Sequence, residues 1–241
     1  SGAKDKMKEQ INIFFQNSMF AGVTLSLLAY IAGSLLKKKF KLGVFNPLLI
    51  SIVISIGVLV AGDIDYEVYN EGAKYLSYLL TPATVCLAIP LYEQWELLKK
   101  NVKAVVAGLV AGVITSITTV FVLSLIMGLS HEEYVTLLPK SITTAIGMGV
   151  SEELGGYVTI TVAVIIVTGV LGNIMGELVC KIFKINEPIS KGLAFGSASH
   201  AIGTAKAMEI GEIEGAMSSL AIAVSGILTV LFATVYSGFI K

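Results

Sequence analysis

Three segments of this sequence, interrupted by proline or glycine, carry the polar side chains that could bind a ligand. They are residues 79–95, 137–156 and 191–212, each within a largely apolar stretch. Proline removes a backbone donor and glycine weakens a helix, so we expect helices to break there. Free backbone N–H groups at a helix start, with hydroxyl and ammonium groups beside them, suit a small anion. The predicted substrate site comprises Thr81, Pro82, Thr84, Lys140, Ser141, Thr143, Thr144, Ser197, Ser199, His200, Thr204 and Lys206.

The same residue types have a structural interpretation. Serine, threonine, glycine and alanine also allow helices to pack closely inside a membrane, so each of these residues taken singly fits a packing role. The three segments taken together favour a binding site. All 17 basic residues are lysines, so an anion would be held by ammonium, hydroxyl or backbone N–H groups and not by a guanidinium fork.

Three polar residues, His200, Asn173 and Glu177, are candidates for ion coupling. The ordinary pKa of histidine suits proton coupling, and an ionisable residue at membrane depth indicates function. His200 fits equally well as a neutral bridge between two helices. Glu177 could bind a cation, but pairing with Lys181 four residues later, or extension to the membrane surface, is the simpler interpretation.

No motif in the sequence indicates catalysis. There is no phosphate-binding loop, no H-E-x-x-H or C-x-x-C pattern, and no Ser-His-Asp set of recognisable spacing. Ser199 and His200 are adjacent, and neighbouring residues on a helix seldom face each other. We therefore expect no enzyme, no cofactor and no metal.

The elements that position these residues are predicted to be membrane helices. Apolar residues make up 55% of the chain and charged residues only 14%, with a net charge of zero. This composition excludes a disordered chain and a nucleic-acid binder. Uncharged runs longer than the ~20 residues that cross a bilayer occur at residues 10–36, 42–62, 104–130, 154–176 and 215–240.

The charges between these runs predict a topology. Lysines cluster at residues 37–41, 99–103 and 181–191, and carboxylates cluster at 63–71, 132–133 and 209–214. The positive-inside rule then puts the lysine loops in the cytoplasm and the N-terminus outside the cell membrane. Residues 137–156 must enter and leave on one face, as a re-entrant hairpin.

The resulting prediction is an all-α membrane protein with about seven crossings, one re-entrant hairpin and an inverted repeat. Each repeat would be a helix, a broken helix and a helix, an arrangement common in secondary transporters. The predicted parts are residues 1–41 (tail and first helix), 42–130 (first repeat), 131–153 (hairpin) and 154–241 (second repeat).

Two of the interrupted segments share a short stretch of similar sequence. Residues 141–147 read SITTAIG and residues 197–203 read SASHAIG, with serine, alanine, isoleucine and glycine in register. The two matching segments do not correspond to each other in the predicted inverted repeat. We therefore interpret them as two helix starts of the same local kind, each rich in hydroxyl and small residues.

The motifs resemble those of the LrgB/CidB family of membrane proteins. They are PATVCLAIPLY at residues 82–92, PKSITTAIGMGVSEELGG at 139–156 and KGLAFGSASHAIGTAKAMEIGEIEGAMSSLA at 191–221. The chain departs from the family at Lys191 and Lys206, where arginine is frequent, and at Ala145, where proline is frequent.

The resemblance implies two competing functions. Bacterial members are described as antiholin-like modulators of murein hydrolase export and lysis that act with a small LrgA/CidA-type membrane partner. Plant relatives carry glycolate and glycerate, and some bacterial relatives are linked to pyruvate uptake. The broken helices favour ion- or proton-coupled transport of small monocarboxylates by alternating access, with the antiholin function as the alternative. A homodimer is expected because 241 residues are few for a carrier that moves as a rigid body.

Overall fold

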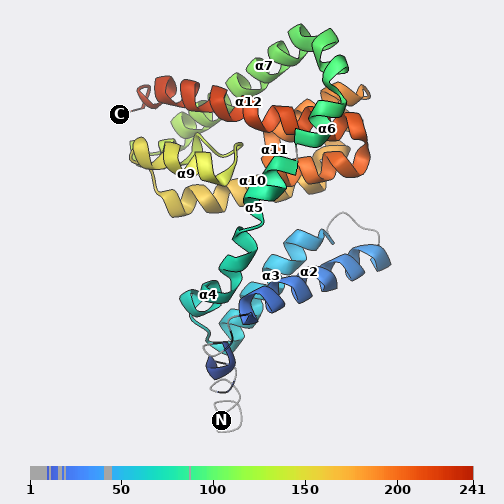
Figure 1. The fold of residues 1–241 in the computed structure, drawn as a ribbon. Coiled ribbons are helices and arrows are strands. Elements are labelled where there is room, and N and C mark those ends of the chain that lie inside the picture. The colour runs from blue at the N-terminus through green and yellow to red at the C-terminus, as the bar shows by residue number, and fades with distance from the viewer. Residues whose placement is uncertain are drawn as a thin grey trace. The chain divides into compact units, whose positions relative to one another are not determined.

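The computed structural model describes residues 10, 12–15, 18, 20–40, 45–86 and 88–240. All secondary structure elements among these residues are α-helices (Figure 1), which confirms the predicted all-α class. The chain divides into two compact units, Ser1–Cys86 and Leu87–Lys241, which are considered separately. Four helical stretches of the described residues are long and apolar enough to cross a membrane: Tyr66–Glu93, Trp95–Met127, Val158–Ile182 and Glu212–Ser237.

The first unit contains α2 (Ala21–Phe40), α3 (Pro47–Gly62), α4 (Tyr66–Ser77) and α5 (Leu80–Cys86). Helix α3 begins at Asn46, whose Oδ1 accepts a hydrogen bond from the Leu48 N–H at 2.8 Å, as is usual for a helix start. Helix α2 packs against α3 and α4. Gly22 permits this approach, because a Cβ there would meet the backbone of Tyr69.

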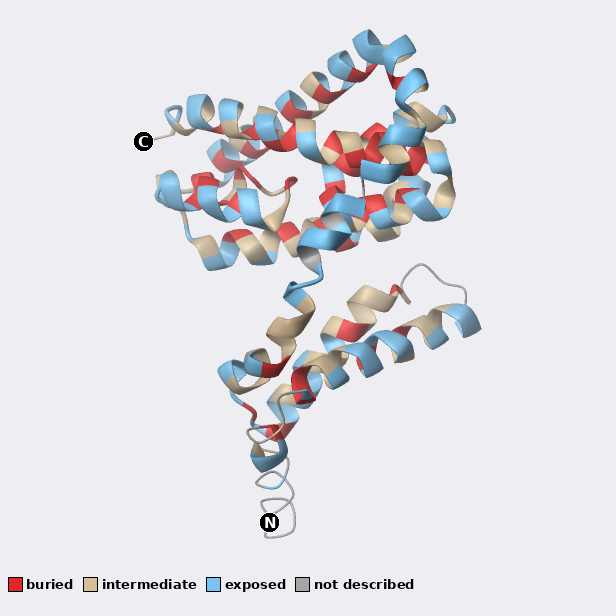
Figure 2. Cartoon of the chain, in the orientation of Figure 1, coloured by how far each residue is buried: buried red, intermediate tan, exposed pale blue. Residues whose placement is uncertain are grey.

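The second unit contains α6 (Ala88–Glu93), α7 (Trp95–Met127), α8 (His131–Leu137), α9 (Thr144–Glu153), α10 (Val158–Ile182), α11 (Pro188–Ile210) and α12 (Glu212–Ser237). Buried residues gather where α7, α11 and α12 face one another, and the outward faces are exposed (Figure 2). Many outward residues are large and apolar, such as Val122, Leu123, Ile227 and Leu231, as expected of helices that face lipid.

Helices α8 and α9 form a first helical hairpin. Ser130 caps α8 in a capping box with Glu133. Thr161, near the start of α10, donates its hydroxyl to Thr136 O at 2.9 Å, and its Oγ1 lies 2.7 Å from Ser151 Oγ, so it ties both arms together. The chain therefore reverses within residues 138–143, in the segment predicted to turn back.

Helix α11 forms a second hairpin, because its backbone breaks at His200 with φ 43° and ψ −139°. Moving along α10, Gly172 lies against Ser199 and Gly176 against Phe195, so the first arm runs antiparallel to α10. Asn173 bonds to Ile202, and Glu177 pairs with Lys206, so the second arm runs parallel to α10. The arms are residues 188–199 and 201–210.

This second hairpin corrects the predicted course of residues 191–212. They were expected to cross as the middle of three helices, but Lys191 and Ile210 line the same hollow at the end of α10. The predicted crossing depended on the acidic residues 209–214 forming a free loop on the outer face, which they do not form. Glu209 is paired with Lys206, and Glu214 is buried.

The predicted first triplet, residues 42–130, is also not seen as one body. Its broken middle element, α5 and α6, is divided between the two units at residue 86. The repeat of helix, broken helix and helix is therefore not confirmed by the described part of the chain.

Candidate functional site

The tips of the two hairpins meet beside the middle of α10. His200 Nε2 lies 3.0 Å from the carbonyl oxygen of Ile165. The side chain of Ile165 also lies directly over Gly147 of the first hairpin. Gly169, one turn further, leaves room for the His200 ring, since a Cβ there would stand 2.8 Å from it. One turn of α10 thus receives both tips.

A cavity of about 720 Å³ opens between these tips, α7 and α10, a size typical of small-molecule sites. Its lining is made almost wholly of small and hydroxyl residues, with a single charged side chain. The lining residues are Ala104, Gly108, Ala111, Gly112, Thr115, Ser116, Thr119, Lys140, Ser141, Thr168, Gly172, Ser190, Leu193, Ala194, Ser197, Ala198 and Ser199.

Lys140 supplies that single charge. Its ammonium group donates to Ser141 Oγ at 2.9 Å and to Ser116 Oγ at 3.4 Å. The two serine hydroxyls are themselves 3.2 Å apart. Lys140 is half-buried, and no carboxylate of the described residues forms an ion pair with it. A cation surrounded only by neutral hydroxyls keeps its full attraction for an anion.

Two serines of the second hairpin also line the cavity. Ser197 bonds only weakly to Ala194 O, at 3.5 Å, so its hydroxyl remains available to a ligand. Across from it stands Gly112 of α7, whose missing Cβ would lie 3.6 Å from Ser197 Oγ. Ser199 is buried against Gly172 of α10. Four predicted residues, Lys140, Ser141, Ser197 and Ser199, are therefore brought together.

His200 and Thr204 support the second hairpin and do not line the cavity. Thr204 Oγ1 donates to His200 O at 3.0 Å and lies 2.7 Å from Ser218 Oγ of α12. Thr143 and Thr144 form the start of α9 and are absent from the lining.

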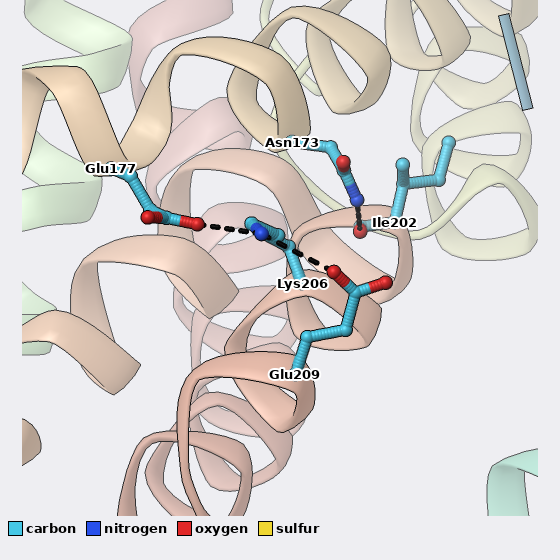
Figure 3. A network of polar contacts seen from close by, with 5 residues as sticks. All are labelled: Asn173, Glu177, Ile202, Lys206 and Glu209. Carbon is cyan, nitrogen blue, oxygen red and sulfur yellow. Dashed lines mark hydrogen bonds and ion pairs between the residues drawn. The ribbon is translucent and has the colours of Figure 1, made fainter. Parts of the chain in front are cut away.

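Glu177, Lys206 and Asn173 join the second arm of α11 to α10 (Figure 3). Lys206 Nζ lies 2.5 Å from Glu177 and 3.2 Å from Glu209. Asn173 Nδ2 donates to Ile202 O at 2.7 Å. Glu177 therefore pairs, as the simpler interpretation held, but with Lys206 and not with Lys181. None of these three residues lines the cavity.

The remaining predicted residues belong to the first unit. Thr81 and Pro82 are exposed residues of α5. The side chain of Thr84 lies outside the described part of the chain.

Sequence reasoning missed the contribution of α7. Gly108, Gly112 and Ser116 recur every four residues, as do Ala111, Thr115 and Thr119, and all six line the cavity. This stripe of small residues is visible in the sequence. In a membrane span such as residues 104–130, the same stripe is equally typical of close helix packing.

The sequence was compared with protein families and with known proteins. The model of the LrgB-like family matches residues 26–239. "Antiholin-like protein LrgB" of Bacillus cereus (strain B4264) is 40% identical over 222 residues, covering 92% of this chain and 96% of the relative. The protein of the same name from Bacillus anthracis (strain A0248) matches equally. No solved structure matches significantly. The chain is thus a membrane protein that belongs to the LrgB-like family.

Proposed function

We propose that this protein is a secondary transporter of small monocarboxylates, with Lys140 as the group that binds the carboxylate. The observation that carries the proposal is the ammonium group of Lys140, which contacts two hydroxyls but no carboxylate of the described residues. A charge is costly at membrane depth, so it indicates an ion pathway or a substrate site. One lysine balances one carboxylate, which favours mono- over dicarboxylates.

The hydroxyl groups around the cavity support the same substrate class. Ser197 lines the same cavity as the pair of Ser116 and Ser141. A glycolate- or pyruvate-like acid has an oxygen next to its carboxylate, and this oxygen would be held by such hydroxyls.

The two hairpins support an alternating-access mechanism. Pro139, Ser141 and Gly147 correspond to Phe195, Ser197 and Gly203 at a constant offset of 56 residues. In each hairpin the glycine of the second arm faces the carbonyl of the residue eight positions earlier. We propose an inverted repeat whose units are α7 with the first hairpin and α10 with the second, so the tips would close the cavity from opposite sides.

Uptake into proteoliposomes tests the proposal. Labelled pyruvate and glycolate should enter saturably, and succinate should enter poorly. Lys140→Gln should weaken apparent affinity about 10- to 100-fold, because a charged hydrogen bond contributes about 1.5–3 kcal/mol. Lys100→Gln, an exposed lysine outside the cavity lining, is the matched control. Equal uptake by the Lys140→Gln and Lys100→Gln proteins would exclude this binding role.

A second candidate function is antiholin-like modulation of murein hydrolase export and lysis. It rests on the printed name of relatives that are 40% identical over most of the chain, and the comparisons favour it over transport. In this proposal the protein acts as a homodimer with a small LrgA/CidA-type membrane partner.

The two candidates can be separated in one strain. Wild type and Lys140→Gln would be expressed in a bacterium that lacks its own homologue, and murein hydrolase activity in the medium would be measured beside acid uptake. A Lys140→Gln protein that loses uptake but still alters hydrolase release would support direct modulation. Loss of both effects together would support lysis control through organic-acid flux.

A further inference from the structure

A second hollow runs along the outside of α10, separate from Lys140. This apolar groove, of about 290 Å³, lies between α10 and the first arm of α11. Leu171, Met175 and Val179 line it from α10, and Ala194 and Phe195 line it from α11. These three α10 side chains are between 40% and 50% exposed. The groove follows α10 from Leu171 to Cys180, or about 14 Å of helix.

The groove opens at one end into a hollow of different chemistry. This basic mouth, of about 210 Å³, shares Cys180, Ile185 and Phe195 with the groove. Its polar side chains are Lys181, Asn186, Lys191 and Glu177. Glu177 is paired with Lys206, which also pairs with Glu209, and the two lysines of the mouth outnumber its one carboxylate. Neither Lys181 nor Lys191 forms an ion pair with a described carboxylate, so the mouth is positively charged.

We propose that this combined hollow binds an anionic phospholipid of the surrounding membrane. The phosphate of the headgroup would lie between Lys181 and Lys191, and one acyl chain would lie along Leu171, Met175 and Val179. Basic hollows between membrane helices on the lysine-rich face are suited to anionic headgroups. A soluble anion would gain nothing from the apolar groove, and a neutral lipid would gain nothing from the two lysines.

The chemistry of the two hollows together selects the occupant. The apolar groove is continuous with the basic mouth through Cys180, Ile185 and Phe195. A phospholipid carries an apolar chain and an anionic headgroup on one molecule, so it matches both hollows at once. The occupant is therefore a lipid.

The groove also lies next to the cavity that contains Lys140. Gly172, Ala194, Ala198 and Ser199 line both hollows. A bound chain would therefore rest against the arm of α11 that forms one wall of the cavity, and would favour the arm position described here. This lipid site does not depend on the transport proposal, because its binding is measured without any acid.

Binding can be measured on the purified full-length protein in detergent. Phosphatidylglycerol and phosphatidylcholine with identical acyl chains would be compared by native mass spectrometry and by the shift of the melting temperature. Phosphatidylglycerol should bind more tightly. The double variant Lys181→Gln/Lys191→Gln should weaken its binding about 25-fold, or about five-fold for each lysine. Lys100→Gln/Lys103→Gln, two exposed lysines outside the mouth, should change nothing.

Two further measurements test the groove itself. Val179→Trp should fill the groove and reduce phosphatidylglycerol binding while leaving the fold intact, because Val179 is 40% exposed. Glycerol phosphate, the headgroup without acyl chains, should not compete at the same concentration. Equal binding of the two lipids, equal loss in both lysine pairs, or full competition by glycerol phosphate would overturn the proposal.

Discussion

Lys140 illustrates at the scale of one residue how a costly group is retained. Its ammonium group is half-buried and its two hydrogen-bond partners, Ser116 and Ser141, are neutral. Burying a charge without a counter-charge destabilises a fold. The sequence pointed to this residue because Lys140 follows Pro139 within an apolar segment. Ser116, its partner on α7, was missed because small residues at helical spacing are equally typical of close packing.

Glycine residues of α10 determine how closely the second hairpin approaches. A Cβ at Gly172 would stand 1.6 Å from Ser199 Oγ, whereas a Cβ at Gly149 of α9 would meet nothing within 4 Å. We predict that Gly172→Ala destabilises the fold by about 1–3 kcal/mol, because the hairpin must shift. Gly149→Ala should be neutral or stabilise by up to about 1 kcal/mol. Thermal unfolding in detergent measures both, and equal melting temperatures would contradict this packing.

The two hairpins show at the scale of the element what sequence can and cannot predict. Pro139 and the glycines that follow it predict the chain reversal of the first hairpin. The second reversal depends on one non-glycine residue with positive φ, His200, and such a conformation is strained for a residue with a side chain. Contacts from distant residues hold it, namely Ile165 O and the space over Gly169. No local pattern announces contacts of that kind.

The buried bond between Thr204 and Ser218 attaches the second arm of α11 to α12. We predict that Thr204→Val destabilises the protein by about 1–3 kcal/mol, since it leaves the buried Ser218 hydroxyl without this partner and removes the bond to His200 O. Ser218→Ala should cost less, because Thr204 keeps its bond to His200 O. The double variant should cost less than the sum, with a coupling of about 0.5 kcal/mol or more. Strict additivity in a double-mutant cycle of unfolding would show that the two hydroxyls do not interact.

The topology of the whole molecule depends on which loops share a face. Charge counting placed residues 209–214 opposite Lys191, but both ends of α11 lie at the same end of α10. Ion pairing within the protein removes charges from the count that the positive-inside rule requires. The rule therefore fails where Lys206 pairs with both Glu177 and Glu209 inside the protein.

The cavity extends from the hairpin tips toward Ala104 and Ser190, beside the lysine-rich ends of α7 and α11. We predict that a cysteine at Ser190 is labelled by a membrane-impermeant thiol reagent from the cytoplasmic side. The native Cys86 and Cys180 would first be replaced by serine and alanine. Inside-out vesicles should react and intact cells should not. Labelling of intact cells would reverse the orientation, and a cysteine at Thr118, outside this cavity, serves as the comparison.

The row of glycines at 169, 172 and 176 has a mechanical consequence. His200, Ser199 and Phe195 each lie in the space that one missing Cβ leaves. Sliding along the helix axis would drive each of these side chains into the backbone of the next turn. Such sliding is therefore opposed, and we expect α10 to move together with its hairpin as one body. A change in the width of the cavity would then move this body against α7 and the first hairpin, whose tip carries Lys140.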